Sequence, residues 1–197
     1  MDIISELNGK RILIWGYGRE GKATEHFLQR CVKPASVDIF EGKKEEIDED
    51  DYDFIIKSPG IVMNEENPKY TSETELFLQQ FRDQVIGITG TKGKSTTSAM
   101  LYTVLKACSG RPVLLLGNIG QPCLDYFEEV TEDTIIVYEM SCHQLAHTNV
   151  SPHIAIFLNL YEEHLDYYGT VEKYFEAKSH IAAYQKSGDY FFVGENV

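Results

Sequence analysis

The chain has 197 residues, 43% of them hydrophobic, which is enough for one large domain or two small domains with separate cores. Its formal net charge of -13 excludes a generic nucleic-acid binder, which needs a basic face. No apolar run reaches the length of a membrane span, and Asp2 and Glu6 stand where a signal peptide carries positive charge, so we expect a cytoplasmic protein without membrane insertion.

The first part of the chain alternates between apolar runs and helical segments, as a parallel α/β sheet requires. Strands are predicted at 11–15, 37–40 and 54–57, with helices over 20–29 and 73–82. The acidic run at 41–53 is most simply a solvated loop or helix face, and we assign it no chemistry. We place a domain boundary after residue 84.

A glycine-rich turn follows the first predicted strand. It reads Gly16-Tyr17-Gly18-Arg19-Glu20-Gly21, and Glu41 comes 20 residues after Gly21. This is the dinucleotide fingerprint, with Glu41 as the candidate for ribose hydroxyls, although any diphosphate suits such a turn. A nicotinamide-binding domain is therefore one hypothesis. Ser58-Pro59-Gly60 follows the third strand, either as a ligand loop or as an ordinary turn.

A second glycine-rich turn lies between a strand at 84–89 and a helix predicted over 95–107. Its residues are Gly90, Thr91, Lys92, Gly93, Lys94, Ser95 and Thr96. Glycines let N–H groups wrap phosphate oxygens at a helix N-terminus, Lys94 can neutralise the β- and γ-phosphates, and Ser95 offers a hydroxyl to Mg²⁺. Five residues separate Gly87 from Gly93, one more than in the ordinary P-loop. The turn predicts a nucleoside triphosphate site.

Further strands are predicted at 113–116, 134–139, 154–158 and 189–193. Glu139 ends one of them, and a carboxylate beside the phosphate-loop strand can hold Mg²⁺ or can be a buried structural glutamate. Asn159 ends the next strand. Thr170 can cap a helix from 171 to about 185 that carries Tyr174 and Lys178 on one face. By residue type alone, Lys178 is an ordinary solvated lysine.

Several motifs together resemble the ATP-dependent Mur ligases of peptidoglycan synthesis. The resemblance is collinear from Gly16 to Lys178 and rests on the phosphate loop followed by these segments: Glu139-Met140-Ser141-Cys142-His143-Gln144-Leu145, Glu163-His164-Leu165-Asp166 and Tyr174-Phe175-Glu176-Ala177-Lys178. It implies an α/β chain with a Rossmann-like UDP-substrate-binding domain over 1–84. It further implies a P-loop Mur-ligase central ATP-binding domain over 85–197, mainly parallel and incomplete at its C-terminal end.

The resemblance also implies roles for individual residues. Lys94, Lys178 and His164 become catalytic candidates, and the loop from Gly90 to Thr96 binds ATP. Two Mg²⁺ ions are implied, one on Ser95 and Glu139 and the other on His164 and a carbamylated Lys178. The first domain uses no nicotinamide, and its UDP contacts become Gly16, Tyr17, Gly18, Arg19, Glu41, Ser58, Pro59 and Gly60. Asn118 contacts the muramoyl group.

Within the family, three segments are most similar to the D-glutamate-adding members: Gly117-Asn118-Ile119-Gly120, Ser58-Pro59-Gly60 and Ser72-Glu73-Thr74-Glu75-Leu76-Phe77. The implied substrates are UDP-N-acetylmuramoyl-L-alanine and D-glutamate. An L-alanine-adding paralogue and a non-catalytic UDP-sugar or nucleotide-binding module remain the alternatives.

This sequence departs from the family pattern at two places and stops early. Glu163 replaces the usual aspartate, and Cys142-His143 replaces the commoner serine and aromatic residue. Family members continue through an adenine-contacting part and a third domain that binds D-glutamate. We therefore expect a monomeric fragment that does not turn over by itself.

Overall fold

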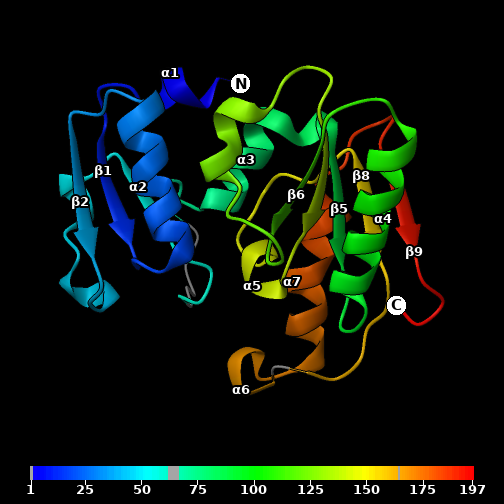
Figure 1. Ribbon diagram of the computed structural model, residues 1–197. Coiled ribbons are helices and arrows are strands. Elements are labelled where there is room, and N and C mark those ends of the chain that lie inside the picture. Colours follow the sequence, from blue (N-terminus) through cyan, green and yellow to red (C-terminus); the bar gives the residue numbers. More distant parts are fainter. Residues whose placement is uncertain (1, 62–66, 164) are drawn as a thin grey trace. The chain divides into compact units, whose positions relative to one another are not determined.

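The computed structural model describes residues 2–61, 67–163 and 165–197 (Figure 1). The chain divides into two compact units. Unit 1 comprises residues 1–80 and 122–127, and unit 2 comprises residues 81–121 and 128–197. Among the described residues, no helix is both long and apolar enough to cross a membrane.

Unit 1 is built on a four-stranded parallel sheet in the order β2-β1-β3-β4. Its strands are β1 (Arg11–Trp15), β2 (Ser36–Phe40), β3 (Phe54–Lys57) and β4 (Tyr70–Thr71). Its helices are α1 (Ile3–Leu7), α2 (Arg19–Cys31) and most of α3 (Glu73–Phe81), with short 3₁₀ turns η1 (Lys44–Glu46), η2 (Glu49–Asp51) and the start of η4 (Leu124–Glu129). The acidic run at 41–53 holds η1 and η2 and is mostly exposed, as expected for a solvated connection.

The core of unit 1 follows from the near-continuous apolar sequence of its central strand. Four consecutive residues of β1, from Ile12 to Trp15, are buried, as in a sheet covered on both faces. Helix α2 buries Phe27 against Phe127, with ring centroids 4.7 Å apart. This contact explains why residues 122–127 pack with unit 1 although they are remote from it in sequence.

Unit 2 contains a five-stranded parallel sheet in the order β6-β7-β5-β8-β9. The strands are β5 (Val85–Thr89), β6 (Val113–Gly117), β7 (Ile135–Glu139), β8 (Ile154–Phe157) and β9 (Tyr190–Val193). The remaining elements are η3 (Arg82–Gln84), α4 (Lys94–Cys108), α5 (Cys142–Leu145), α6 (Leu165–Tyr168) and α7 (Val171–Ala183).

Helices α4 and α7 contact opposite faces of β5. On one face, Ile88 and Val137 form a core cluster against which Leu101 and Leu105 of α4 pack. On the other face, Lys178 of α7 reaches Thr89, whose side chain points away from that of Ile88 because neighbouring strand residues alternate. The carboxyl ends of β5, β6, β7 and β8 meet at one edge of this sheet, because all of these strands are parallel and in register (Figure 1).

The predicted α/β class with mainly parallel sheets is confirmed. Observed strands and helices begin and end within about two residues of the expected ones, and Thr170 caps α7 by accepting a hydrogen bond from the Lys173 N–H. Short elements without a strong periodic signal, among them α1, β4 and α5, were not expected.

Candidate functional site

The glycine-rich turn of unit 2 connects β5 to α4 through two unusual backbone conformations. Gly90 has φ of 153° and Gly93 has φ of 83°. A Cβ added at Gly90 would lie 3.0 Å from Cβ of Leu158, so the turn has little room for a side chain there. Gly93 is the N-cap of α4, no side chain caps this end, and the first helical bond runs from Thr97 N–H to Gly93 O. The N–H groups at 93–96 precede the helical ladder and are suited to bind an anion.

Lys94 is folded back onto this turn. Its ammonium donates to Gly90 O at 2.9 Å and to Thr91 O at 3.1 Å. Both acceptors are neutral main-chain oxygens of the same loop. Ser95 and Thr96 follow in the first turn of α4 and are exposed, so a ligand can reach both hydroxyls from solvent.

Glu139 is fully buried at the carboxyl end of β7, opposite Ile88 of β5 and Gly117 of β6. Its Oε1 accepts a hydrogen bond of 2.7 Å from Asn118 Nδ2, whereas its Oε2 has no hydrogen-bond partner among the described residues. A buried carboxylate oxygen without a donor is costly. Glu139 therefore has features of both alternatives from the sequence. One oxygen is held by the protein, as in a buried structural glutamate, and the other is available to a cation.

Lys178 is buried to 1% exposure, so the expectation of a solvated lysine is wrong. Its ammonium donates to Gly90 O at 2.9 Å and lies 4.9 Å from the centre of the Tyr174 ring. Burial is the main cause that lowers the pKa of Lys178 to about 8, and the positive charge of Lys94 acts in the same direction. Lys178 and Lys94 thus converge on one carbonyl oxygen of the phosphate loop.

The segment after β8 contacts the phosphate loop at several points that the sequence did not reveal. Asn159 bonds to Thr91 and Lys92, and the Tyr161 N–H donates to Thr91 Oγ1 at 3.0 Å. Glu163 forms an ion pair with the exposed Lys92 ammonium. The longer carboxylate at 163 therefore has a partner in the loop.

Two further predictions concern His164 and the segment that follows β7. His164 lies outside the described residues. The segment Ser141-Cys142-His143-Gln144 forms a capping box at the start of α5, in which Ser141 Oγ accepts from Gln144 N–H and Gln144 Oε1 accepts from Ser141 N–H. The spacing of serine and glutamine was the sequence signal for this cap. In the described part of the chain, no group of three or more histidine, cysteine, aspartate or glutamate side chains is arranged to hold a metal.

The glycine-rich turn of unit 1 is packed so closely that two of its glycines have no room for a side chain. A Cβ at Gly16 would lie 2.6 Å from Ser58 Oγ, and one at Gly21 would lie 2.2 Å from Gly16 O. Space is open at Gly18, the uncapped N-cap of α2. Ser58 Oγ donates to Gly16 O at 3.0 Å, so the loop after β3 supports the turn after β1. These are the features that a diphosphate-binding turn needs.

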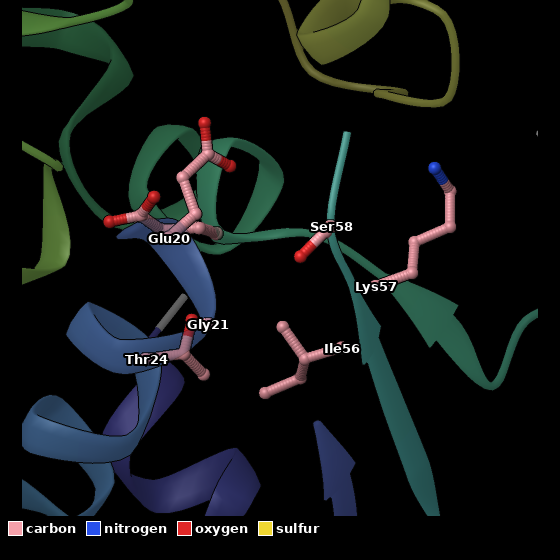
Figure 2. Close-up of a pocket in the computed structure, with 7 residues that line it drawn as sticks. Glu20, Gly21, Thr24, Ile56, Lys57 and Ser58 are labelled. Atoms are coloured by element: carbon pink, nitrogen blue, oxygen red, sulfur yellow. The ribbon is translucent and has the colours of Figure 1, made fainter. Parts of the chain in front are cut away.

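A narrow pocket lies beside this turn (Figure 2). It is lined by Glu20, Gly21, Thr24, Ile56, Lys57, Ser58 and Glu73. Burial raises the pKa of the Glu73 carboxyl well above its usual range, and the charge of Glu20 adds to this effect. Figure 2 shows the Lys57 side chain extending away from Glu20 and Gly21.

Lys57 is 4% exposed, and burial lowers its pKa to about 8 although the charges of Glu20 and Glu75 oppose this shift. Its ammonium donates to Ile61 O at 3.1 Å. The pocket beside the unit 1 turn thus contains two carboxyl groups and one buried lysine, whereas two lysine ammoniums contact the unit 2 turn itself.

The remaining unit 1 candidates lie around the same turn. Tyr17 donates from its hydroxyl to Glu25 of α2, and the Lys22 ammonium lies 5.8 Å from the centre of its ring. Arg19 begins α2 and is exposed, and Glu41 directly follows β2 and is exposed as well. Pro59 and Gly60 follow Ser58, and space is open around Gly60.

The sequence profile of the Mur ligase middle domain matches residues 88–196. The chain belongs to the Mur ligase family. Because the matched region begins within β5 and ends after β9, it covers the phosphate loop, Glu139 and Lys178.

Two curated relatives extend the match to unit 1. The chain is 36% identical over 170 residues to the UDP-N-acetylmuramoylalanine--D-glutamate ligase of Clostridium kluyveri, covering 82% of this chain and 37% of the relative. It is 33% identical over 227 aligned positions to the ligase of the same name from Streptococcus pyogenes serotype M49, covering 100% of this chain and 50% of the relative. The chain thus spans half or less of the length of these relatives.

Solved Mur ligase structures share the fold. The UDP-N-acetylmuramate:L-alanyl-gamma-D-glutamyl-meso-diaminopimelate ligase from Neisseria meningitides matches with a TM-score of 0.59 at 17% identity, covering 95% of this chain and 72% of that one. MurF from Acinetobacter baumannii matches with a TM-score of 0.50 at 23% identity, covering 68% and 34%. At these identities the likeness concerns the fold alone.

Proposed function

We propose that the chain is the nucleotide-binding part of an ATP-dependent ligase that adds D-glutamate to UDP-N-acetylmuramoyl-L-alanine in peptidoglycan precursor synthesis. Residues 1–84 bind the UDP substrate and residues 85–197 bind ATP. The observation that carries the proposal is the buried Glu139, at the edge of the sheet where β5 leads into the phosphate loop. Its second carboxylate oxygen has no hydrogen-bond partner among the described residues. The curated relatives that carry this enzyme's name support the choice within the family.

The phosphates of ATP bind at the N-terminus of α4. The N–H groups at 93–96 and the Lys94 ammonium stabilise their negative charge, and Lys94 exchanges its neutral acceptors Gly90 O and Thr91 O for phosphate oxygens. In the proposed reaction, the carboxylate of the alanyl group attacks the γ-phosphorus and ADP leaves. The amine of D-glutamate then attacks the acyl phosphate, loses a proton and expels phosphate. Because a carboxylate must approach an anion, positive charge and N–H dipoles are the main catalytic requirement.

A first Mg²⁺ fits the residues present. Ser95 offers an exposed hydroxyl and Glu139 an unpartnered carboxylate oxygen, both of them hard oxygen ligands. When bound, the ion would neutralise charge that develops on the phosphates. Asn118 orients the Glu139 carboxylate through Oε1, in addition to its proposed contact with the muramoyl group.

The second proposed metal site uses His164 and Lys178. An ammonium repels Mg²⁺, whereas a carbamate provides oxygen ligands. Carbamylation requires the neutral amine, which attacks CO₂ to form the N–C bond and releases one proton. Since the pKa of Lys178 is lowered to about 8, more of this amine is neutral near physiological pH than in an ordinary lysine, which supports the proposed modification.

In unit 1, the turn from Gly16 to Arg19 and the loop from Ser58 to Gly60 bind the diphosphate of the UDP substrate. Open space at Gly18 allows an anion to approach the main chain, and the uncapped N-terminus of α2 attracts negative charge. Glu41, at the carboxyl end of β2, is the proposed partner of the ribose hydroxyls.

The proposal is tested by calorimetric titration of the 197-residue chain with UDP-N-acetylmuramoyl-L-alanine, UDP-N-acetylmuramic acid and NAD⁺. We expect the alanylated nucleotide to bind most tightly. Preference for the unalanylated nucleotide would assign the chain to an L-alanine-adding paralogue. Binding of NAD⁺ alone would contradict a UDP site in unit 1.

A further inference from the structure

Asn159 holds the phosphate loop from the carboxyl end of the neighbouring strand β8. Its main-chain oxygen accepts from Thr91 N–H at 3.0 Å. Its side chain forms two more bonds with Lys92: Oδ1 accepts from the Lys92 N–H at 2.8 Å, and Nδ2 donates to Lys92 O at 3.0 Å. One residue thus forms a hydrogen bond with each of the three peptide groups that join Gly90 to Gly93.

These bonds matter because the loop is intrinsically free. Gly90 and Gly93 flank the two held residues, and both have positive φ. Glycine adopts this conformation easily, but it does not by itself restrict the loop to it. A loop that must become ordered when phosphate binds loses affinity through that ordering, and a loop that is already held does not. The side chain of Lys92 is directed to the same segment, because its ammonium pairs with Glu163.

The bonds also divide the N–H groups of the loop into two sets. Those of Thr91 and Lys92 are used by Asn159, whereas those at 93–96 precede the first bond of the α4 ladder, from Thr97 to Gly93. A ligand can therefore bind the second set without breaking the bonds of the first.

We propose that Asn159 is a positioning residue for the nucleotide phosphates, which fixes residues 91–92 so that the N–H groups at 93–96 converge on a di- or triphosphate. It touches no reacting atom and acts through the loop. This inference rests on the proposed function of the loop as an ATP site, and neither the sequence motifs nor the comparisons assign Asn159 a role.

The test is calorimetric titration of the full 197-residue chain with ADP in excess Mg²⁺, for the unaltered chain and for Asn159→Ala. The substitution removes both side-chain bonds to Lys92 but leaves the main-chain bond to Thr91, and we expect affinity to fall about tenfold. Hydrogen exchange followed by NMR gives a second readout, because the Lys92 amide should exchange faster in the variant. Asn159→Ser, whose shorter side chain cannot span both Lys92 groups, is used if the alanine variant does not fold, and the same loss is expected.

Gln84→Ala is the matched control. The Gln84 Nε2 also donates hydrogen bonds to main-chain oxygens, those of Thr131, Glu132 and Thr134, but at the opposite end of β5. It should lower stability by a similar amount and leave the affinity for ADP unchanged, so a merely structural role of Asn159 would predict the same for both variants.

The outcomes separate the two levels of the proposal. Equal affinity of Asn159→Ala and the unaltered chain overturns the positioning role alone, and so does tighter binding, which would mean that Asn159 competes with phosphate for the Lys92 N–H. Failure of the unaltered chain to bind ADP overturns the ATP site and the positioning role together.

Discussion

The two glycine-rich turns are built on the same plan but differ in the charged side chains that contact them. Both connect a buried parallel strand to a helix with no side-chain N-cap. Around the unit 2 turn, Lys94 and Lys178 both donate to Gly90 O. Beside the unit 1 turn, the pocket contains Glu20 and Glu73, and the Lys57 side chain extends away from them. A strand–turn–helix motif therefore provides N–H groups for an anion, whereas the side chains nearby determine how much negative charge it can bind.

The source of rigidity differs as well. In unit 1, the turn is held mainly by close packing, since any Cβ at Gly21 would overlap Gly16 O, and one hydrogen bond from Ser58 Oγ adds to it. In unit 2, the loop is fixed by hydrogen bonds from Asn159 to Thr91 and Lys92. Substitutions that add atoms should therefore damage the first turn most, and substitutions that remove donors or acceptors should damage the second.

The largest expected effect is on the steric turn. Gly21→Ala places a Cβ 2.2 Å from Gly16 O, and because that oxygen belongs to the main chain, relief requires the turn to move. We expect the free energy of unfolding of unit 1 to fall by about 3 kcal/mol or more. Urea denaturation followed by Trp15 fluorescence measures this, because the only tryptophan of the chain is buried in unit 1. Gly18→Ala, at an open position, is the control and should change stability by less than about 1 kcal/mol.

The next effect concerns the buried lysine of unit 1. The pKa of Lys57 is lowered to about 8 from the ordinary value of 10.5, so between these two pH values the unfolded chain binds more protons than the folded one. The free energy of unfolding should therefore rise with pH through this window, by at most about 3 kcal/mol. The rise should be complete above the window.

Lys57→Met should remove that rise. The measurement compares Trp15-detected urea midpoints at pH 7 and pH 10 for the unaltered chain, Lys57→Met and Lys10→Met, in which an exposed lysine is replaced. Lys10→Met should keep the pH dependence, and a rise of the same size in Lys57→Met would show that another group causes it.

A third prediction separates two lysines of the phosphate loop. Lys94→Ala removes the cation that we propose contacts the phosphates, and the affinity for Mg²⁺-ADP should fall about 100-fold, as expected for a charge-assisted hydrogen bond. Lys92 is 68% exposed and pairs with Glu163, and such surface pairs contribute little, so Lys92→Ala should change affinity by less than about threefold. Equal losses in the two variants, measured by calorimetry, would argue against distinct roles.

The smallest expected effect is on the link between the two loops of unit 1. Ser58→Ala removes the hydrogen bond from Ser58 Oγ to Gly16 O and should cost about 1 kcal/mol of unit 1 stability. Ser36→Ala, at an exposed position at the start of β2, serves as the control in the same Trp15-detected titration. A loss no larger than that of the control would mean that Ser58 does not support the turn.

The regular strands and the two turns could be predicted from sequence because their signals are local. Apolar runs of four to six residues that end at a glycine predicted β1 and β5. Thr170 predicted the start of α7. The spacing of Ser141 and Gln144 is a local signal of the same kind, because it is typical of the capping box that begins α5.

The features that could not be predicted depend on tertiary contacts. Residues 122–127 join unit 1 through Phe27 and Phe127, which are 100 positions apart. Nothing local distinguishes Lys178 from a solvated lysine, because its burial results from the packing of α7 on β5. Likewise, the sequence shows Asn159 only as a polar residue at the end of a strand. The parallel pairing of β8 with β5 is what places it beside Thr91. Sequence motifs therefore identified the candidate site residues. They did not predict which of these side chains have shifted pKa values or which neighbouring residues hold them in place.

The central claim is that one chain holds two separate nucleotide sites, one for each turn. The most direct measurement is calorimetric titration of UDP-N-acetylmuramoyl-L-alanine into the 197-residue chain, first alone and then saturated with ADP and Mg²⁺, together with the Lys94→Ala variant. We predict one equivalent of UDP nucleotide in all three cases, with a weaker affinity for ADP only in the variant. Competition between the two nucleotides, or loss of the UDP nucleotide in Lys94→Ala, would contradict the assignment of separate sites.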